Sequence, residues 1–342
     1  MKIYRALPPD EYQFDFIVSE EGGCYTQEVL SHGGHIYPIP LRTKDPVGAF
    51  RGITRVVREN GYEAVLKLGN TPIAALDLIA ARKGGARILG MRSCNALTNQ
   101  SAKDKLLDTL LRPILNLVAN VKIAPSMLAA EFTFGRTRAH KDVHLLHNGV
   151  DLRAFRYDEE GRQRIRNEFA LKDRLVVGHI GRFHKQKNHS YLLEIFQQIR
   201  QQRPDAALLL VGIGELEQSV RLQARELGLE DAVIFTGQRF DIPQLLSAMD
   251  VFVFPSLHEG MPNTVIEAQA TGLPCVIADT ITPEADLTGL VTYLPLTESR
   301  QIWAQTALSA VTPERRNTHG DFVAQGYDID TVAQELVKLL GC

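Results

Sequence analysis

The stretch HEGMPNTVIEAQATGLP (residues 258–274) contains two glutamates whose spacing would allow them to act together in catalysis or in ligand binding. Glu259 and Glu267 lie eight positions apart, on either side of a short run with the features of a helix start. A carboxylate pair can act as general acid and base, or it can hold the hydroxyl groups of a ligand. As acid and base, the two groups must face one scissile bond across about 5 to 9 Å. The pair alone leaves both alternatives open.

The residues between the two glutamates predict an anion site. Gly260 lets the backbone pass close to a ligand, and Pro262 and Asn263 suit the first turn and the cap of a helix whose body is TVIEAQATG. Free N–H groups at a helix start and the helix dipole both attract negative charge. We therefore expect an anionic group of a ligand to sit at this helix start.

A second anion site is predicted directly after the run VVGHIG. The segment RFHKQKNH places Arg182, Lys185 and Lys187 just before the helix SYLLEIFQQIRQQ, although a solvated basic turn is the alternative. Two such helix starts on one sheet edge fit a diphosphate better than a single phosphate. A diphosphate seated between Glu259 and Glu267 would leave each carboxylate facing a different end of the ligand, which favours a clamp.

The elements that must position these residues follow an alternating pattern. Short apolar runs rich in Val, Ile and Phe alternate with longer amphipathic segments, which is typical of parallel sheets with crossover helices. The predicted strands of the first half are residues 15–19, 35–40, 63–68, 87–91, 121–126 and 143–148. Those of the second half are residues 175–181, 206–212, 232–237, 251–256, 274–279 and 291–296.

The length of 342 residues exceeds the size at which one core usually stops growing. Residues 148–174 are polar and carry no strand signal, so we read them as a linker followed by the entry helix of a second domain. We expect an α/β protein with two Rossmann-like, doubly wound domains, residues 1–150 and 151–342, facing across a cleft. The last helix could pack back on the first domain. Ligands in such sheets bind beyond the carboxyl ends of the strands.

Composition excludes several classes of protein. A net charge of −2 gives no electrostatic footprint for nucleic acid. The four cysteines have no paired spacing, which indicates neither zinc nor a disulfide framework and fits the cytoplasm. The most apolar long stretch, DKLLDTLLRPILNLVANVKI from Asp104, is broken by charges and by Pro113, so it reads as a core helix. The alternative is a helix that also contacts a membrane surface, at the inner face of the plasma membrane.

Three segments of the second half together resemble a known family. They are GRFHKQKN, LLLVGIGELE and VIFTGQRFDIPQLLSAMDVFVFPSLHEGMPNTVIEAQATGLPCVIAD. Their order closely resembles the retaining glycosyltransferases of family 4, also called glycosyltransferase group 1, which have the GT-B fold. In the first half, IAPSMLAAEFTFG and LLHNGVDLRAF resemble the end of that family's acceptor domain and its linker.

The resemblance implies roles for residues at the matching positions. It implies that Arg182 and Lys187 hold the donor diphosphate, Glu267 bonds the ribose and Glu259 faces the transferred sugar. It also implies that the backbone of Gly260, Met261 and Pro262 lies near the sugar and phosphates, and that Asn263, Thr264 and Val265 form the helix start. Gln238 and Arg239 would lie near the base. Fixed cations and helix N–H groups would stabilise the leaving diphosphate, so no metal and no cofactor is expected.

The chain departs from the family pattern in two places. MKIYRALPPDEYQFDFIV begins where the family's first helix would end, so we expect the first domain to lack its first, central strand; the alternative is that MKIYRAL is that strand. Family histidines are replaced by residues 66–68 and 92–95. Arg92 and Asn95 remain as polar candidates on the acceptor side.

These features predict a metal-independent hexosyltransferase. We expect it to move a sugar, with retention, from a nucleotide diphosphate sugar, UDP above all, to a glycan acceptor. The acceptor would be lipid-linked and part of surface polysaccharide synthesis. Two alternatives stay open, a degenerate protein that binds a nucleotide sugar or a partner without catalysis, and a nucleotide-sugar epimerase.

Overall fold

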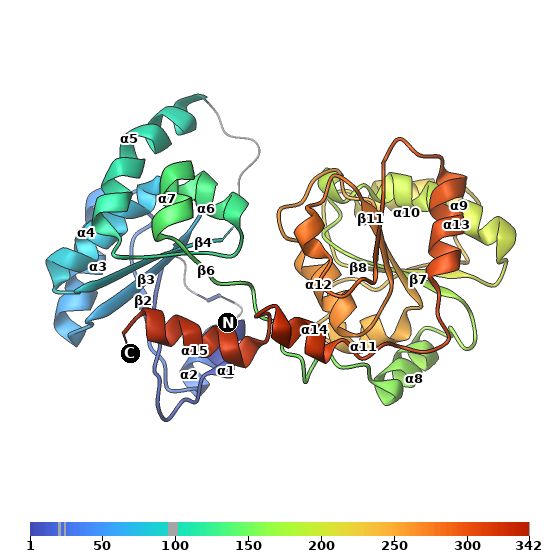
Figure 1. The fold of residues 1–342 in the computed structure, drawn as a ribbon, viewed down its shortest axis with the longest axis horizontal. Coiled ribbons are helices and arrows are strands. Elements are labelled where there is room, and N and C mark those ends of the chain that lie inside the picture. Colours follow the sequence, from blue (N-terminus) through green and yellow to red (C-terminus); the bar gives the residue numbers. More distant parts are fainter. Residues whose placement is uncertain (20–21, 24, 95–101, 342) are drawn as a thin grey trace. The chain divides into compact units, whose positions relative to one another are not determined.

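The structure is a computed structural model that describes residues 1–19, 22–23, 25–94 and 102–341. The chain divides into two compact units (Figure 1): unit 1 is Met1–Gly149 with Ile329–Cys342, and unit 2 is Val150–Asp328. Each unit consists of parallel sheets and helices, so the α/β prediction is confirmed. The helix α15 (Ile329–Leu339), the last helix of the chain, belongs to unit 1.

Unit 2 is built on one six-stranded parallel sheet. Its strands are β7 (Val176–Ile180), β8 (Ala207–Val211), β9 (Val233–Phe235), β10 (Val251–Phe254), β11 (Cys275–Ala278) and β12 (Val291–Leu294). Its helices are α8 (Glu159–Glu168), η2 (Lys185–Lys187), α9 (His189–Gln202), α10 (Glu217–Glu226), α11 (Ile242–Ala248), α12 (Asn263–Ala270), η3 (Pro283–Ala285), α13 (Arg300–Ala310) and α14 (His319–Ala324). The predicted strands are confirmed, each two or three residues shorter than predicted.

The central strands of unit 2 are buried along their whole length. Every residue of β7, β8, β10 and β11 is buried. Neighbouring residues of one strand pack into different cores on the two faces of the sheet. Leu209 packs in the cluster that includes Phe252 and Phe254, whereas Leu208 packs in the cluster that includes Phe196. Strands covered on both faces need continuous apolar runs, which is why LLLV and VFVF stand out in the sequence.

The strand order in unit 2 brings two distant loops together. The order is β12-β11-β10-β7-β8-β9, so β7 and β10 are neighbours. In the chain, 70 residues lie between the end of β7 and the start of β10. From β7 the chain continues to β8 on one side, and from β10 it continues to β11 on the other. This reversal is the switch point at which doubly wound sheets bind ligands.

Unit 1 contains two separate parallel sheets. The sheets are β1 (Phe16–Val18) with β2 (Ile36–Pro38), and β3 (Ala64–Gly69) with β4 (Ile88–Ser93), β5 (Val121–Ala124) and β6 (His144–Leu145). The helices are α1 (Lys2–Ala6), α2 (Thr26–Ser31), α3 (Pro46–Asn60), η1 (Pro72–Ala74), α4 (Ala75–Gly84), α5 (Ala102–Val118), α6 (Met127–Phe134), α7 (Arg136–Asp142) and α15. Here too the predicted strands are found, with shifted ends.

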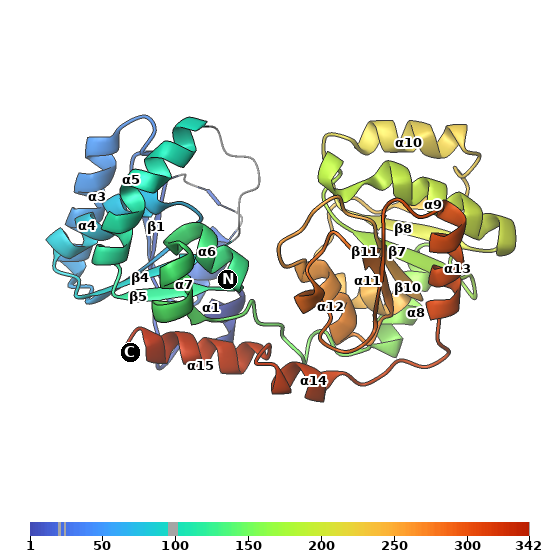
Figure 2. The ribbon, with the colours of Figure 1, turned by 45° about the horizontal axis from the view of Figure 1, so that its top comes forward.

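The segment MKIYRAL is a helix, so the reading of it as a first strand is wrong. Residues Lys2–Ala6 form α1, and Leu7 packs in a small core with Ala333 and Val337 of α15. Figure 2 shows α1 beside α15. The apolar side chains of the segment are therefore covered by a helix and not by flanking strands.

The longest helices follow their sequence signals. α3 starts with Pro46, and the Asp45 side chain accepts a hydrogen bond from Gly48 N; the helix ends at Gly61, whose φ of 67° suits glycine. α5 covers most of the apolar stretch from Asp104 and contains Pro113. No helix within the described ranges is long and apolar enough to cross a membrane.

Candidate functional site

The loops that follow β7 and β10 are joined at the switch point of unit 2. Gln186 Nε2 donates to His258 O at 2.7 Å, and Leu257 N donates to Gln186 O at 2.8 Å. The first loop carries Arg182 and Lys187, and the second carries Glu259. The structure therefore brings together the two regions that the sequence singled out for anion binding.

Lys187 and Glu259 form the central ion pair of this region. Lys187 Nζ lies 2.7 Å from Glu259 Oε1, and the two side chains are only 18% and 12% exposed. Nζ also lies 4.5 Å from the centre of the Phe254 ring. Charges this far from solvent are stable only when they are paired, and an aromatic face adds attraction for a cation. The opposite charges of Lys187 and Glu259 therefore balance each other, on the loops that follow β7 and β10.

Glycines let the loops after β7 and β8 pack closely against each other. A Cβ atom at Gly181 would lie 3.2 Å from the Cδ and Cε atoms of Lys187. A Cβ at Gly212, where φ is 139°, would collide with Gly181 O, and a Cβ at Gly214 would collide with the backbone of Phe183. These contacts fix the path of the basic loop and leave the Lys187 stem room to reach Glu259.

Arg182 occupies a different environment from Lys187. Its side chain is 74% exposed, and its NH2 group lies 3.4 Å from Glu215 on the loop after β8. Exposed pairs of this kind contribute little to stability, so the guanidinium can leave Glu215 for a ligand at small cost. Two cations therefore flank the switch point, one fixed and one adjustable.

The start of α12 differs from the predicted cap. Pro262 is the residue before the helix, with φ −79° and ψ 95°, and no side chain caps the helix. Asn263 is therefore the first helical residue and not the cap, because the extended backbone of Pro262 already takes the cap position. Thr264 Oγ1 is buried and, as far as the structure is described, has no hydrogen-bond partner. Val265 N and Ile266 N donate to Pro262 O at 3.0 and 3.2 Å. The positive end of the helix dipole still favours an anion at this helix start.

The remaining residues of this stretch line the same turn and helix. Glu267 is buried, with 9% of its surface exposed, and Val265 is fully buried. Gly260 and Met261 are half-buried, between Glu259 and the helix. Glu267 lies on the helix and Glu259 on the loop before it, as expected from the sequence.

Two buried histidines beneath Lys187 were not predicted as part of the site. The rings of His179 and His189 lie 4.8 Å apart, and His189 stacks on Phe183 at 4.4 Å. Burial first, and Lys187 second, lower the pKa of His189 to about 4; burial also lowers the pKa of His179. His179 Nδ1 lies 2.9 Å from Val253 O, which fixes its tautomer. Both rings are therefore neutral and support the lysine without repelling it.

Three predicted residues lie in other surroundings. Arg239 forms ion pairs with Glu168 at 2.6 Å and Asp241 at 2.7 Å, whose hydrogen bonds raise its pKa, while Gln238 is exposed. Their contacts with a base stay predictions. In unit 1, Arg92 donates to His147 O and Asn148 Oδ1, both at 3.2 Å, so it holds a backbone segment.

Asn95 lies outside the described residues. Within the described ranges, no group of three His, Cys, Asp or Glu side chains is arranged as metal ligands would be.

Comparison with known proteins places this geometry in a family. The model of the family described as glycosyl transferases group 1 matches residues 174–341. EpsF of Bacillus subtilis strain 168, named as a glycosyltransferase, is 33% identical over 338 residues, which cover 96% of this chain and 88% of EpsF. The Escherichia coli enzyme named UDP-Gal:alpha-D-GlcNAc-diphosphoundecaprenol alpha-1,3-galactosyltransferase is 36% identical over 141 residues, covering 40% of this chain and 36% of that protein.

Solved structures agree on the fold. Anabaena Alr3699/HepE in complex with UDP superimposes with a TM-score of 0.75 at 19% identity, over 96% of this chain and 99% of that one. A glycosyltransferase of Rickettsia africae ESF-5 gives a TM-score of 0.79 at 13% identity, over 99% and 92% of the two chains. The chain therefore belongs to the group 1 glycosyl transferases, and it is a glycosyltransferase of the GT-B fold.

Proposed function

We propose that this glycosyltransferase moves a hexose from a UDP-sugar to a lipid-linked glycan acceptor, with retention, in the synthesis of a surface polysaccharide. The observation that carries the proposal is the Lys187–Glu259 pair, 2.7 Å apart at the switch point and directly before the uncapped start of α12. A diphosphate is the anion that such a paired cation and helix start would receive together. A carboxylate beside it suits the hydroxyl groups of a sugar.

In this proposal the cationic residues bind the diphosphate and the carboxylates bind hydroxyl groups. Lys187, Arg182 and the first N–H groups of α12 contact the diphosphate and stabilise the charge that develops on it as the sugar leaves. Glu259, released from Lys187, accepts hydrogen bonds from the sugar, and Glu267 holds the ribose. No metal ion is needed for this arrangement, because fixed cations supply the positive charge.

The relatives support the choice of UDP and of a lipid-linked acceptor. The Anabaena protein was crystallised with UDP, and in a second crystal with UDP-glucose. The name of the Escherichia coli relative specifies UDP-Gal as donor and a sugar on diphosphoundecaprenol as acceptor. We extend both features to this chain.

Contact with a membrane surface forms part of the proposal, because a lipid-linked acceptor stays in the bilayer. On α5, Leu106, Leu110, Ile114 and Leu117 are 40–81% exposed and follow one another at helical spacing. A row of exposed leucine and isoleucine side chains is typical of a helix that lies on lipid.

Vesicle binding tests this contact. The double variant Leu110→Ser, Leu117→Ser should lose sedimentation with phosphatidylglycerol vesicles. Leu222→Ser on α10, which is also an exposed leucine, should not. Equal sedimentation of both variants would remove the membrane from the proposal.

Titration calorimetry with UDP tests the donor site. Lys187→Ala should weaken UDP binding by at least roughly tenfold, since a charge-assisted contact is lost. Lys185→Ala is the matched control, because Lys185 is exposed in the same turn and forms no such pair with any described residue. UDP affinity that is unchanged in Lys187→Ala would contradict the proposed site.

A donor incubation separates this function from its alternatives. Nucleotide release that needs a glycan acceptor is expected of a transferase. An epimer formed from the UDP-sugar alone would indicate an isomerase, and UDP-sugar binding without turnover on any acceptor would indicate a non-catalytic protein.

A further inference from the structure

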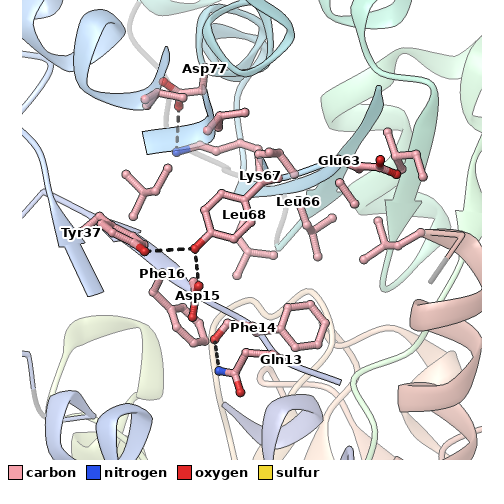
Figure 3. Close-up of a pocket in the computed structure, with 18 of the residues that line it drawn as sticks. Gln13, Phe14, Asp15, Phe16, Tyr37, Glu63, Leu66, Lys67, Leu68 and Asp77 are labelled. Atoms are coloured by element: carbon pink, nitrogen blue, oxygen red, sulfur yellow. Dashed lines mark hydrogen bonds and ion pairs between the residues drawn. The ribbon is translucent and has the colours of Figure 1, made fainter. Parts of the chain in front are cut away.

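Two cations of unit 1 share one buried carboxylate. Arg42 contacts Oδ1 of Asp77, and Lys67 Nζ lies 2.9 Å from Oδ2. The three residues line a cavity of about 690 Å³ between β1 and β3, and Figure 3 shows the contact of Lys67 with Asp77. The side chain of Asp77 is 10% exposed, whereas those of Arg42 and Lys67 are 25% and 38% exposed. The carboxylate is therefore the inner member of this cluster, and both cations reach solvent.

Three segments of the chain bring the cluster together at strand ends. Lys67 lies in β3, two residues before its last residue, and Asp77 lies in the first turn of α4, which follows β3. Arg42 lies on the loop between β2 and α3, and its NH1 group donates to Ile73 O at 3.4 Å. The cluster is therefore at the carboxyl ends of strands, where folds of this class bind their ligands.

The cluster carries more positive than negative charge. One cation would be enough to balance Asp77, and the first turn of α4 adds the positive end of a helix dipole. Burial first, and the charge of Arg42 second, lower the pKa of Lys67. Positive charge that is partly removed from water is costly without a counter-charge. A further anion would therefore be stabilised here.

Arg92, the cation that the sequence predicted for the acceptor side, has its donors directed elsewhere. Its NH2 group donates to His147 O and to Asn148 Oδ1, both at 3.2 Å. Lys67 differs, because its Nζ carries three N–H groups and, within the part of the chain that the structure describes, forms an ion pair with Asp77 alone. N–H groups of Lys67 therefore remain for a ligand.

Exposed apolar side chains flank the cluster. Each of its three members has an exposed leucine as a neighbour in the chain, namely Leu41, Leu68 and Leu76. Val47, in the first turn of α3, is exposed as well. Single exposed leucines are ordinary, but four apolar side chains around one group of charges indicate a ligand that has an apolar part beside its anion.

The helix that carries the row of exposed leucines belongs to the same part of unit 1. α5 packs against η1 and α4. Ile73, whose carbonyl oxygen accepts the hydrogen bond from Arg42, lies in η1, and Asp77 lies in α4. The cation cluster and the helix proposed to contact lipid are therefore held by one group of packed elements.

We propose that Lys67 and Arg42 bind the phosphate group that joins the acceptor glycan to its lipid, and that the exposed leucines beside them contact the start of the lipid chain. Asp77 is a positioning residue, which holds both cations at the strand ends. The inference rests on the proposed function in one respect, because it takes the acceptor to be lipid-linked. It makes Lys67 and Arg42 residues that select the acceptor, in unit 1.

Binding of farnesyl diphosphate, a short prenyl diphosphate, is the first test. The full chain is titrated in excess UDP, so that the donor site of unit 2 is occupied. Lys67→Ala should weaken binding by roughly tenfold or more, because a charge-assisted contact is lost, and Lys67→Arg should restore most of it.

Lys83→Ala is the matched control, because Lys83 is exposed in the last turn of α4, and it should bind as tightly as the unchanged chain. Equal affinity in Lys67→Ala and Lys83→Ala would overturn the proposal. An unchanged chain that does not bind farnesyl diphosphate would overturn it too.

Two further ligands identify the source of the anion. Inorganic diphosphate has the charge without the chain, and glucuronate carries its charge on a sugar. Farnesyl diphosphate should bind more tightly than either by roughly tenfold or more, since apolar contacts add to the charge. Glucuronate that binds as tightly, and loses its binding in Lys67→Ala, would assign the cluster to an acidic sugar and overturn the assignment to the lipid link.

The kinetics of transfer separate this inference from the proposed function. Two acceptors carry the same glycan, one on a prenyl diphosphate and one on an uncharged octyl group. In Lys67→Ala, KM for the first acceptor should rise about tenfold at unchanged kcat, because an anion contact is lost, and KM for the second should not change. An equal rise of KM for both acceptors would overturn the proposal.

The two possible failures have different signatures. An unchanged chain that transfers sugar to neither acceptor would contradict the proposed function. The binding of farnesyl diphosphate would still decide the role of Lys67, because that measurement needs no turnover.

Discussion

The two units use the same architecture with different completeness. In unit 2, six strands form one sheet, the four strands from the middle of the order are buried throughout, and the switch point holds the Lys187–Glu259 pair. In unit 1, the sheet is divided and a cavity of about 690 Å³ lies between its parts. A continuous sheet fixes the ends of neighbouring strands, and so it can hold charged groups in one geometry. A divided sheet leaves apolar side chains beside empty space.

Core truncation should give the largest difference between the units. Leu208→Ala in β8 removes a fully buried side chain and should lower the free energy of unfolding of unit 2 by about 2–5 kcal/mol. Leu66→Ala, beside the cavity of unit 1, should cost about 1 kcal/mol, because few atoms pack against its free side. Urea unfolding measures both, with the single tryptophan, Trp303, reporting on unit 2 and amide exchange on unit 1. Equal losses of unfolding free energy in Leu208→Ala and Leu66→Ala would contradict the expected difference in packing between the two units.

Glu259→Gln should separate sugar recognition from diphosphate binding. We expect transfer to fall by about 10²–10³, as when one preorganised polar group is removed from an active site. UDP affinity should stay the same or rise, because Lys187 no longer has a competing carboxylate. Steady-state kinetics and calorimetry measure the two quantities, and the exposed Glu215→Gln is the control. A parallel loss of UDP affinity would contradict the assignment of Glu259 to the sugar.

Acid should destabilise unit 2 through its buried histidines. The pKa of His189 is lowered from about 6.5 to about 4, so the unfolded chain takes up a proton before the folded one does. The contribution of neutral His189 to the free energy of unfolding is fully present above pH 6.5 and falls as the pH drops towards 4. Below pH 4 this group causes no further change. The loss is on the order of 3 kcal/mol.

His189→Leu should flatten that profile, followed by Trp303 fluorescence from pH 7 to pH 4. The control is His319→Ala, since His319 is exposed in the same unit. A profile as steep in His189→Leu as in the unchanged chain would show that other groups cause the acid sensitivity.

Arg182→Ala should have the smallest effect on the site. The side chain is exposed and its partner Glu215 is exposed as well, so folding should be unchanged. We expect UDP affinity to fall by less than in Lys187→Ala, within about tenfold. Calorimetry on the two variants gives the ratio directly. A larger loss for Arg182 would mean that the adjustable cation, and not the fixed one, dominates diphosphate binding.

Much of unit 2 was predictable because its signals are local. Short continuous apolar runs such as 206–212, bounded by turn residues, are typical of strands covered on both faces. The doubly wound pattern then makes the loops after β7 and β10 neighbours. Lys187 and Glu259 could therefore be assigned to one site, although 72 positions separate them.

Features that depend on packing across the chain were beyond the sequence. Arg239 meets Glu168, 71 positions away, only because α8 ends beside its loop. The contact of His179 with His189 depends on how β7 and α9 face each other, which no spacing rule gives. MKIYRAL is too short for its period to distinguish helix from strand, and its contact with α15 decided the outcome.

The pairing of Lys187 with Glu259 has a consequence for discrimination among ligands. A free phosphate ion that approached Lys187 would have to leave a largely buried carboxylate without its cation, and leaving one member of such a pair unpartnered is costly. A sugar alone would leave the cation unsatisfied in the same way. Under the proposed function, a molecule that offers an anion and hydroxyl groups together compensates both halves of the pair, so we expect the intact donor to bind more tightly than either fragment.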